Sequence, residues 1–384
     1  MRANLMQPHL HTSTLADGRE ILYFDEVARP HTETDTRPLT PRSLEDTGEV
    51  RYDALHDEWI AVAAHRGNRT YLPPADQCPL CPSQPGRPSE IPASEYDVVV
   101  FENRFPSLGP AVGIVPPSQG WGSSSTGFGR CEVVAFTSEH EGSFGTLSVD
   151  RAHTVLQALA QRTKALSALP GIKQVFPFEN RGKDIGVTLP HPHGQIYAYP
   201  YVTPRAQSMG LAALKHFDQT GTVLLADLLR AESESGERVI AQGEHFTAFV
   251  PFAARWPLEV QVVPHRQVAD LSELSEAEMA ELAPMYLDLL RRFDAIYDSP
   301  TPYISAWHQA PLDARLRPVS RLNLQITSPR RAADKLKFLA GSEAAMGAFI
   351  SDTTPENIAQ ALRSAGDRLA ATPANSPTHQ EQSA

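Results

Sequence analysis

The chain has 384 residues, 41% of them hydrophobic, and a formal net charge of −11 at pH 7. This length and apolar content are enough for one large domain, or two of ordinary size, with a buried core. The negative charge opposes attraction to a polyphosphate backbone, so nucleic acid is not expected as a partner and phosphate chemistry must use local cations.

Export and membrane insertion are not expected. The opening residues Met1–Met6 lack the apolar segment of a secretory signal, and no run of about 18 apolar residues occurs. Only three cysteines are present, which argues against an extracellular disulfide framework. We therefore expect a cytoplasmic protein with no membrane partner, in which Cys131 is a buried thiol.

The predicted elements, in chain order, are short strands separated by loops, with fewer helices. Strand-like apolar runs occupy residues 58–64, 97–101, 132–136, 173–178 and 194–199. The Gly-, Ser- and Pro-rich residues 110–130 are interpreted as a long hairpin connection. One helix is predicted around 155–166, and a capping box at Ser275–Glu278 predicts another that runs to about residue 297. Strand pairs followed by helices indicate an α+β fold with a mainly antiparallel sheet.

A weak internal repeat indicates two related halves. His265 lies 125 residues after His140, and Asn323, in Asn-Leu-Gln-Ile, lies 130 residues after His193, in His-Gly-Gln-Ile. We expect a partly mobile extension at 1–48, a first half at 49–205, a second half at 206–365 and a disordered tail at 366–384.

The segment His191-Pro-His-Gly-Gln195 carries most of the chemical information. On a strand, the side chains of residues 191, 193 and 195 project to one face, so two imidazoles and an amide would converge on one site. Pro192 lacks a ladder donor and Gly194 permits close approach, which predicts a strand at an edge or a cleft. Taken alone, the pattern also fits two exposed histidines on a polar strand face.

The runs 178–182 (Phe-Glu-Asn-Arg-Gly) and 186–196, which ends in His-Pro-His-Gly-Gln-Ile, resemble the active-site segment of galactose-1-phosphate uridylyltransferases, a branch of the histidine-triad superfamily. The resemblance extends from about Arg51 through Ala361. It implies two histidine-triad-like halves that form a mainly antiparallel sheet or half-barrel flanked by helices, and a homodimer. The implied reaction is ping-pong exchange of UMP between UDP-glucose and a hexose 1-phosphate through a covalent uridylyl-histidine. The hexose 1-phosphate is galactose 1-phosphate.

The resemblance assigns the catalytic roles. A neutral imidazole at His193 would attack the α-phosphorus, with its other ring nitrogen donating to a carbonyl of the same strand. Gln195 stands where simple histidine-triad hydrolases have a third histidine, and we expect its amide to favour transfer over hydrolysis. Asn180 and Thr188 are expected to donate hydrogen bonds around the phosphoryl group.

Three further segments are implied to bind substrate, although each would otherwise be an ordinary surface or loop segment. Two arginines would clamp the diphosphate, residues 103–105 would hold the nucleoside, and a C-terminal segment would hold the sugar phosphate. The residues concerned are Arg66, Arg69, Asn103, Arg104, Phe105, Lys337, Ala340, Gly341 and Glu343.

Cys78-Pro-Leu-Cys81 has the spacing with which two thiolates share one zinc ion. The resemblance adds His140 and His191 and so implies one structural zinc per chain. The alternative is a pair of reduced, partly buried thiols.

No second metal is expected. His308 matches one ligand of an iron-type site known in some family members, but Asn323 and Gln325 replace two histidines and Met209 replaces a carboxylate. Amides and a thioether are poor ligands for a hard metal ion, so His308 is interpreted as a hydrogen-bonded structural residue.

Two alternative functions stay open. Arg104 replaces an acidic residue of the usual pattern and Phe349 replaces a sugar-binding Gln, which also fits a nucleotide-sugar phosphorylase with an adenylyl donor and inorganic phosphate. The other alternative is a noncatalytic nucleotide-binding protein.

Overall fold

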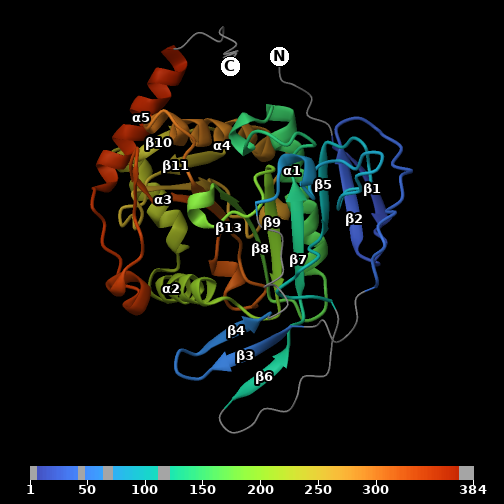
Figure 1. The fold of residues 1–384 in the computed structure, drawn as a ribbon. Helices are drawn as coiled ribbons and strands as arrows, with labels where there is room; N and C mark the ends of the chain where they lie inside the picture. Colours follow the sequence, from blue (N-terminus) through green and yellow to red (C-terminus); the bar gives the residue numbers. More distant parts are fainter. Residues whose placement is uncertain (1–6, 42–47, 64–71, 111–121, 372–384) are drawn as a thin grey trace.

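The computed structural model describes residues 7–41, 48–63, 72–110 and 122–371 (Figure 1). Within them the main element is an open, antiparallel sheet of eleven strands, whose two edges, β1 and β10, do not pair with each other. In spatial order the strands are β1 (His9–Thr14), β2 (Glu20–Asp25), β5 (Val98–Glu102), β7 (Arg130–Ala135), β9 (His193–Tyr199), β8 (Gln174–Arg181), β13 (Tyr303–His308), β14 (Asn323–Ser328), β12 (Leu258–Pro264), β11 (Phe246–Phe249) and β10 (Val239–Gln242). The predicted α+β class and mainly antiparallel sheet are confirmed.

The middle of the sheet has a symmetric register. Strands β8 and β13 pair with Phe178 opposite Ala306. Each of these two residues also faces a glutamine on the next strand outward. Gln195 of β9 lies opposite Phe178, and Gln325 of β14 lies opposite Ala306. A two-fold rotation about the 178/306 pair therefore superimposes β9 on β14, the two strands that carry the repeated sequence.

Two capped helices cover one face of the sheet and form the main core with it. In α1 (Val149–Ser167) the Ser148 side chain accepts from the backbone N–H of Arg151. In α4 (Glu276–Ile296) Ser275 and Glu278 form the predicted capping box. Helix α5 (Pro355–Ala371) packs on α4, as Figure 1 shows. The helix continues past residue 366, where the sequence analysis placed the start of the tail.

The opposite face carries elements that the sequence did not indicate. Helices α2 (Pro204–Thr220) and α3 (Leu224–Ser235) each end at a glycine with positive φ, Gly221 (φ 74°) and Gly236 (φ 68°). Of the described helices, none combines the length and apolarity needed to span a bilayer.

Two small sheets complete the described part of the chain. One contains β4 (Glu58–Val62), β3 (Glu49–Asp53) and β6 (Ser123–Thr126), below the main sheet in Figure 1, and the other contains β15 (Arg330–Ala332) and β16 (Lys335–Leu336). Strand β6 lies within residues 110–130, which the sequence indicated only as a connection. Its Ser- and Thr-rich sequence alternates half-buried and exposed residues and contains no apolar signal.

Candidate active site and metal site

Strand β9 presents a polar row to one face of the sheet. His193, Gln195 and Tyr197 alternate with buried Gly194, Ile196 and Ala198, as the period of two requires. The sequence predicted a strand at an edge or a cleft; β9 lies between β7 and β8, at a cleft and not at an edge. A Cβ at position 194 would lie 2.8 Å from the Phe136 ring, which explains the need for glycine there.

The polar row opens into a cavity of about 540 Å³. Seven of the expected site residues line it: His193, Gln195, Asn180, Thr188, Asn103, Arg104 and Phe105. Glu90, Phe178 and Tyr197 also line it and were not expected, although Tyr197 continues the alternation begun by His193. A cavity of this size can hold a nucleotide-sized ligand against polar side chains.

One hydrogen bond fixes the His193 imidazole. Its Nδ1 lies 2.8 Å from the backbone oxygen of His191, so Nδ1–H donates and Nε2 keeps its lone pair. This is the expected bond to a carbonyl of the same segment. Burial lowers the pKa of His193 below its usual value, so the ring is neutral near pH 7.

The residues expected to bind the nucleoside lie at one wall. Asn103 Oδ1 accepts from the backbone N–H of Phe105 at 2.8 Å, which fixes this short turn. The Arg104 guanidinium stacks 5.5 Å above the Phe105 ring and lies 3.6 Å from a Glu90 carboxylate oxygen. Phe105 is thus placed as an apolar surface beside a charged rim.

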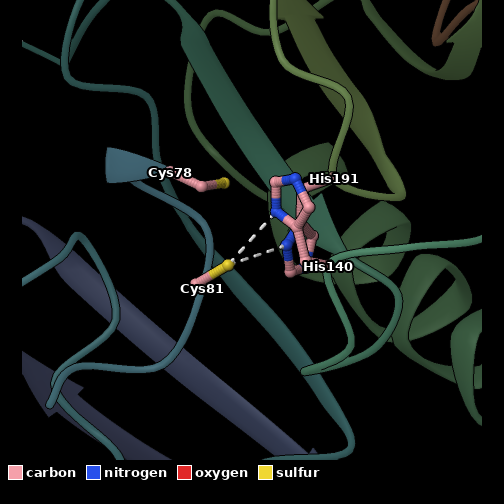
Figure 2. A group of neighbouring side chains, drawn as sticks. All are labelled: Cys78, Cys81, His140 and His191. Carbon is pink, nitrogen blue, oxygen red and sulfur yellow. Dashed lines mark hydrogen bonds between the residues drawn. The ribbon is translucent and has the colours of Figure 1, made fainter. Parts of the chain in front are cut away.

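Two cysteines and two histidines gather beside the cavity. The ligand atoms of Cys78, Cys81, His140 and His191 all lie within 4.8 Å of one another, and Figure 2 shows them pointing toward a common centre. Cys81 Sγ lies 3.3 Å from His140 Nδ1 and 3.6 Å from His191 Nδ1. These separations match the edges of a tetrahedron built on bonds of about 2.3 Å to sulfur and about 2.0 Å to nitrogen.

The surroundings of His191 also suit a metal ligand. Its Nε2 lies 2.8 Å from the Thr137 oxygen, so Nε2–H donates there and the Nδ1 lone pair points at the thiols. Burial, and then the neighbouring Cys78 thiol, raise the pKa of Cys81 to about 12, so a thiolate there needs a compensating cation. The donor set therefore fits a tetrahedral metal ion such as zinc.

His191 departs from one expectation. The period of two placed it with His193 and Gln195, but β9 begins at His193 and His191 lies before it, 1% exposed, in the metal cluster. The alternation does not extend to a residue outside the strand.

The expected sugar-phosphate residues, which lie in the described part of the chain, do not line this cavity. Lys337 and Glu343 pair with each other at 3.1 Å, beside Ala340 and Gly341 at the π-helix 341–345. Arg66 and Arg69 lie outside the described residues. The chain resumes at Leu72, whose N–H donates to the Thr188 oxygen at 2.8 Å.

The position of the iron-type site holds no cluster of metal-ligating side chains within the described residues. His308 Nε2 lies 3.1 Å from Gln325 Oε1, so His308 is hydrogen-bonded as interpreted. Gln325 Nε2 in turn donates to a Glu259 carboxylate oxygen at 2.6 Å. This position is thus occupied by a chain of hydrogen bonds.

Comparisons with known proteins agree on one family. Residues 39–203 match the model described as galactose-1-phosphate uridyl transferase, N-terminal domain, and residues 212–381 match its C-terminal domain. The chain is similar to galactose-1-phosphate uridylyltransferases of Streptomyces lividans (51% identity, 78% of this chain and 80% of the relative) and Thermotoga maritima (36%, 82% and 98%). A solved uridylyltransferase structure superposes with a TM-score of 0.74 at 30% identity, over 84% of this chain and 99% of that one.

Proposed function

Because this chain belongs to the galactose-1-phosphate uridyl transferase family, we propose that it exchanges UMP between UDP-glucose and galactose 1-phosphate through His193. The observation that carries this proposal is the His193 imidazole, which lines the large cavity with Nδ1 bonded to the His191 carbonyl and Nε2 left as nucleophile.

In the first half-reaction, His193 Nε2 attacks the α-phosphorus of UDP-glucose. A P–N bond forms, the P–O bond to glucose 1-phosphate breaks, and glucose 1-phosphate leaves with the electron pair. The His191 carbonyl accepts from Nδ1–H and stabilises the positive charge that develops on the ring. In the second half-reaction, a phosphate oxygen of galactose 1-phosphate attacks the same phosphorus, the P–N bond breaks and neutral His193 returns.

Three cavity residues near His193 supply donors without a titratable proton. Gln195, Asn180 and Thr188 line the cavity around His193, and their amide and hydroxyl groups can hydrogen-bond the phosphoryl oxygens. Asn103 and Phe105 would hold the ribose and the base. Arg66 and Arg69 are proposed to clamp the diphosphate, which the Leu72–Thr188 hydrogen bond supports because it brings the chain after them beside the cavity.

The Cys78, Cys81, His140 and His191 cluster is proposed to hold one structural zinc ion. With four protein ligands, such a site is closed to substrate, so zinc would act by fixing the protein. His191 precedes the catalytic strand, and Pro79 and Leu80, between the two cysteines, form part of the cavity wall. The ion would therefore hold the start of β9 against that wall.

The sugar-phosphate segment supports the expected homodimer. Lys337 and Glu343 lie away from the cavity of their own protomer, while nearby Phe338 (75% exposed) and Met346 (80%) present apolar surface. We propose that these residues meet a second copy of the chain and its hexose phosphate. Light scattering after size exclusion should give the mass of a dimer, and a fully active monomer would refute this part of the proposal.

The test of the reaction uses UDP-glucose labelled at the α-phosphorus, with no acceptor. Acid-labile label should remain on the denatured protein, disappear in His193→Asn and persist in His308→Asn, a matched histidine on the same face of the sheet. Galactose 1-phosphate should then release the label as UDP-galactose. Release by inorganic phosphate alone, or a preference for ADP-glucose, would favour a phosphorylase instead. Nucleotide binding without labelling would leave a noncatalytic protein.

A further inference from the structure

A second cavity, of about 220 Å³, lies on the same face of the main sheet as the nucleotide cavity. Helices α2 and α3 form its apolar walls, with Met209, Ala213 and Leu225 among the lining residues, and His308 and Asn323 of the sheet line its floor. None of these residues takes part in the proposed transfer reaction.

The register of the sheet makes this cavity the counterpart of the nucleotide cavity. The rotation that superimposes β9 on β14 places Asn323 where His193 lies. The local bonds correspond as well: Asn323 Nδ2 donates to the Arg321 oxygen at 3.4 Å, as His193 Nδ1 does to the His191 oxygen at 2.8 Å. An amide nitrogen is not a nucleophile, so this cavity can bind a ligand but cannot form a covalent intermediate at position 323.

Two buried polar groups in this cavity lack partners within the described part of the chain. Arg321 is 6% exposed and its Nε has no hydrogen-bond partner, and Asn323 is 2% exposed and its Oδ1 has none. Leaving such atoms unpaired is costly, and a buried guanidinium is costly without a counter-ion.

Arg321 differs from its neighbour Arg317 in its lack of an acidic partner among the described residues. Arg317 is paired with Asp270 at 2.6 Å and Glu273 at 2.7 Å. Arg321 has no carboxylate within ion-pair distance among the described residues, and one of its Nη atoms donates to the backbone oxygen of His265. Burial lowers the pKa of Arg321, and no acidic group counteracts this shift. A bound anion would stabilise the charged guanidinium in this environment.

We propose that the second cavity binds a small organic carboxylate with a compact apolar body and an O–H or N–H donor. The carboxylate would accept from the Arg321 guanidinium, the donor would bond the Asn323 side chain, and the body would pack between α2 and α3. A cavity of 220 Å³ exceeds the one of about 150 Å³ that accommodates benzene. Inorganic phosphate would leave the apolar walls unfilled, and Arg321 would repel a metal cation.

Isothermal titration calorimetry of the full chain tests this with mandelate, which combines a phenyl ring, a carboxylate and a hydroxyl. We expect saturable binding at about one site per chain. Arg321→Met and Ala213→Leu, which fills the cavity and keeps the charge, should each weaken it at least about tenfold. Exposed Arg315→Met is the matched control and should leave it unchanged.

Comparison ligands separate the contributions. Phenylacetate, without the hydroxyl, and mandelamide, without the charge, should both bind more weakly than mandelate. Binding should persist with UMP present and in His193→Asn, because the two cavities are separate, so the result stands apart from the transfer reaction. The proposal is overturned if mandelate gives no saturable heat, if mandelamide binds equally well, if UMP displaces it, or if Ala213→Leu leaves the affinity unchanged.

Discussion

The clearest quantitative prediction concerns Glu179, a buried carboxyl on the face of the main sheet opposite the large cavity. It lies on β8 between the cavity residues Phe178 and Asn180, but faces α4 and is 6% exposed. Tyr303 O–H donates to its Oε1 at 2.9 Å, and the Tyr286 hydroxyl lies 3.5 Å from its Oε2. Burial raises the pKa of Glu179 from 4.5 to about 7, because two hydroxyls do not replace the water lost around a carboxylate.

The shift fixes the sign of the pH dependence. Between pH 4.5 and about 7, the folded protein keeps a proton that the unfolded chain has released, so the free energy of unfolding falls as pH rises through this window. At about 1.4 kcal/mol per pKa unit, the loss from this one group is about 3 kcal/mol, and it is complete above pH 7. Below pH 4.5 both states are protonated and the group contributes no pH dependence.

Glu179→Gln should remove this loss, because a glutamine is neutral throughout and its Oε1 can still accept from Tyr303. Relative to the parent, the variant should gain about 3 kcal/mol between pH 5 and pH 8. Urea unfolding at both pH values, followed by tryptophan fluorescence, measures the difference. Glu234→Gln, at an exposed position of α3, is the matched control. If both variants keep the parent's pH dependence, Glu179 is ionised in the folded protein and the reasoning is wrong.

Three further outcomes are expected. Ser275→Ala removes the α4 capping box and should cost about 1 kcal/mol in urea unfolding. Phe293→Ala, at a fully buried position of α4, should cost about 3–5 kcal/mol in the same assay, and a smaller loss would mean that the core collapses around the cavity. If the proposed zinc is bound, Cys81→Ser should abolish the zinc signal in atomic emission and lower the melting temperature, whereas Cys131→Ser, at a buried thiol outside the cluster, should keep that signal.

The cavity-lining residues of β9 were predictable because strand geometry alone places them. His193 and Gln195 share a face in any extended strand, and the cavity lies on that face. Where the backbone leaves the strand, the same argument fails, as it does for His191. That residue could be assigned to the metal only by resemblance, because the position of Cys81 relative to it depends on how distant segments pack.

Helices α2 and α3 were not predicted because their buried residues do not form an apolar helical period. The buried residues of α2 are Ala206, Gly210 and Ala213, which are too small to give an apolar period, while larger apolar residues such as Phe217 are exposed. In α3 the buried positions include Glu232, which pairs with Arg238 at 2.9 Å. Which residues of α2 and α3 are buried depends on tertiary contacts, and the spacing of apolar residues in the sequence does not predict these contacts.

The two halves of the sheet also differ in how the start of the equivalent strand is held. In the first half, His191 joins the proposed metal cluster, and its Nε2–H donates to the backbone oxygen of Thr137. In the second, Arg321 takes the equivalent position and donates to the backbone oxygen of His265, which the strand register aligns with Thr137. In the second half, a buried positive charge lies where the strand meets a loop from the neighbouring segment, whereas in the first two thiolates would balance the charge of a divalent ion. A metal ion would tie the start of β9 to the cavity wall through four ligands, whereas the guanidinium supplies its own charge, and its Nε has no partner among the described residues. The first arrangement suits the nucleophile proposed at His193, and the second suits the anion proposed for the second cavity.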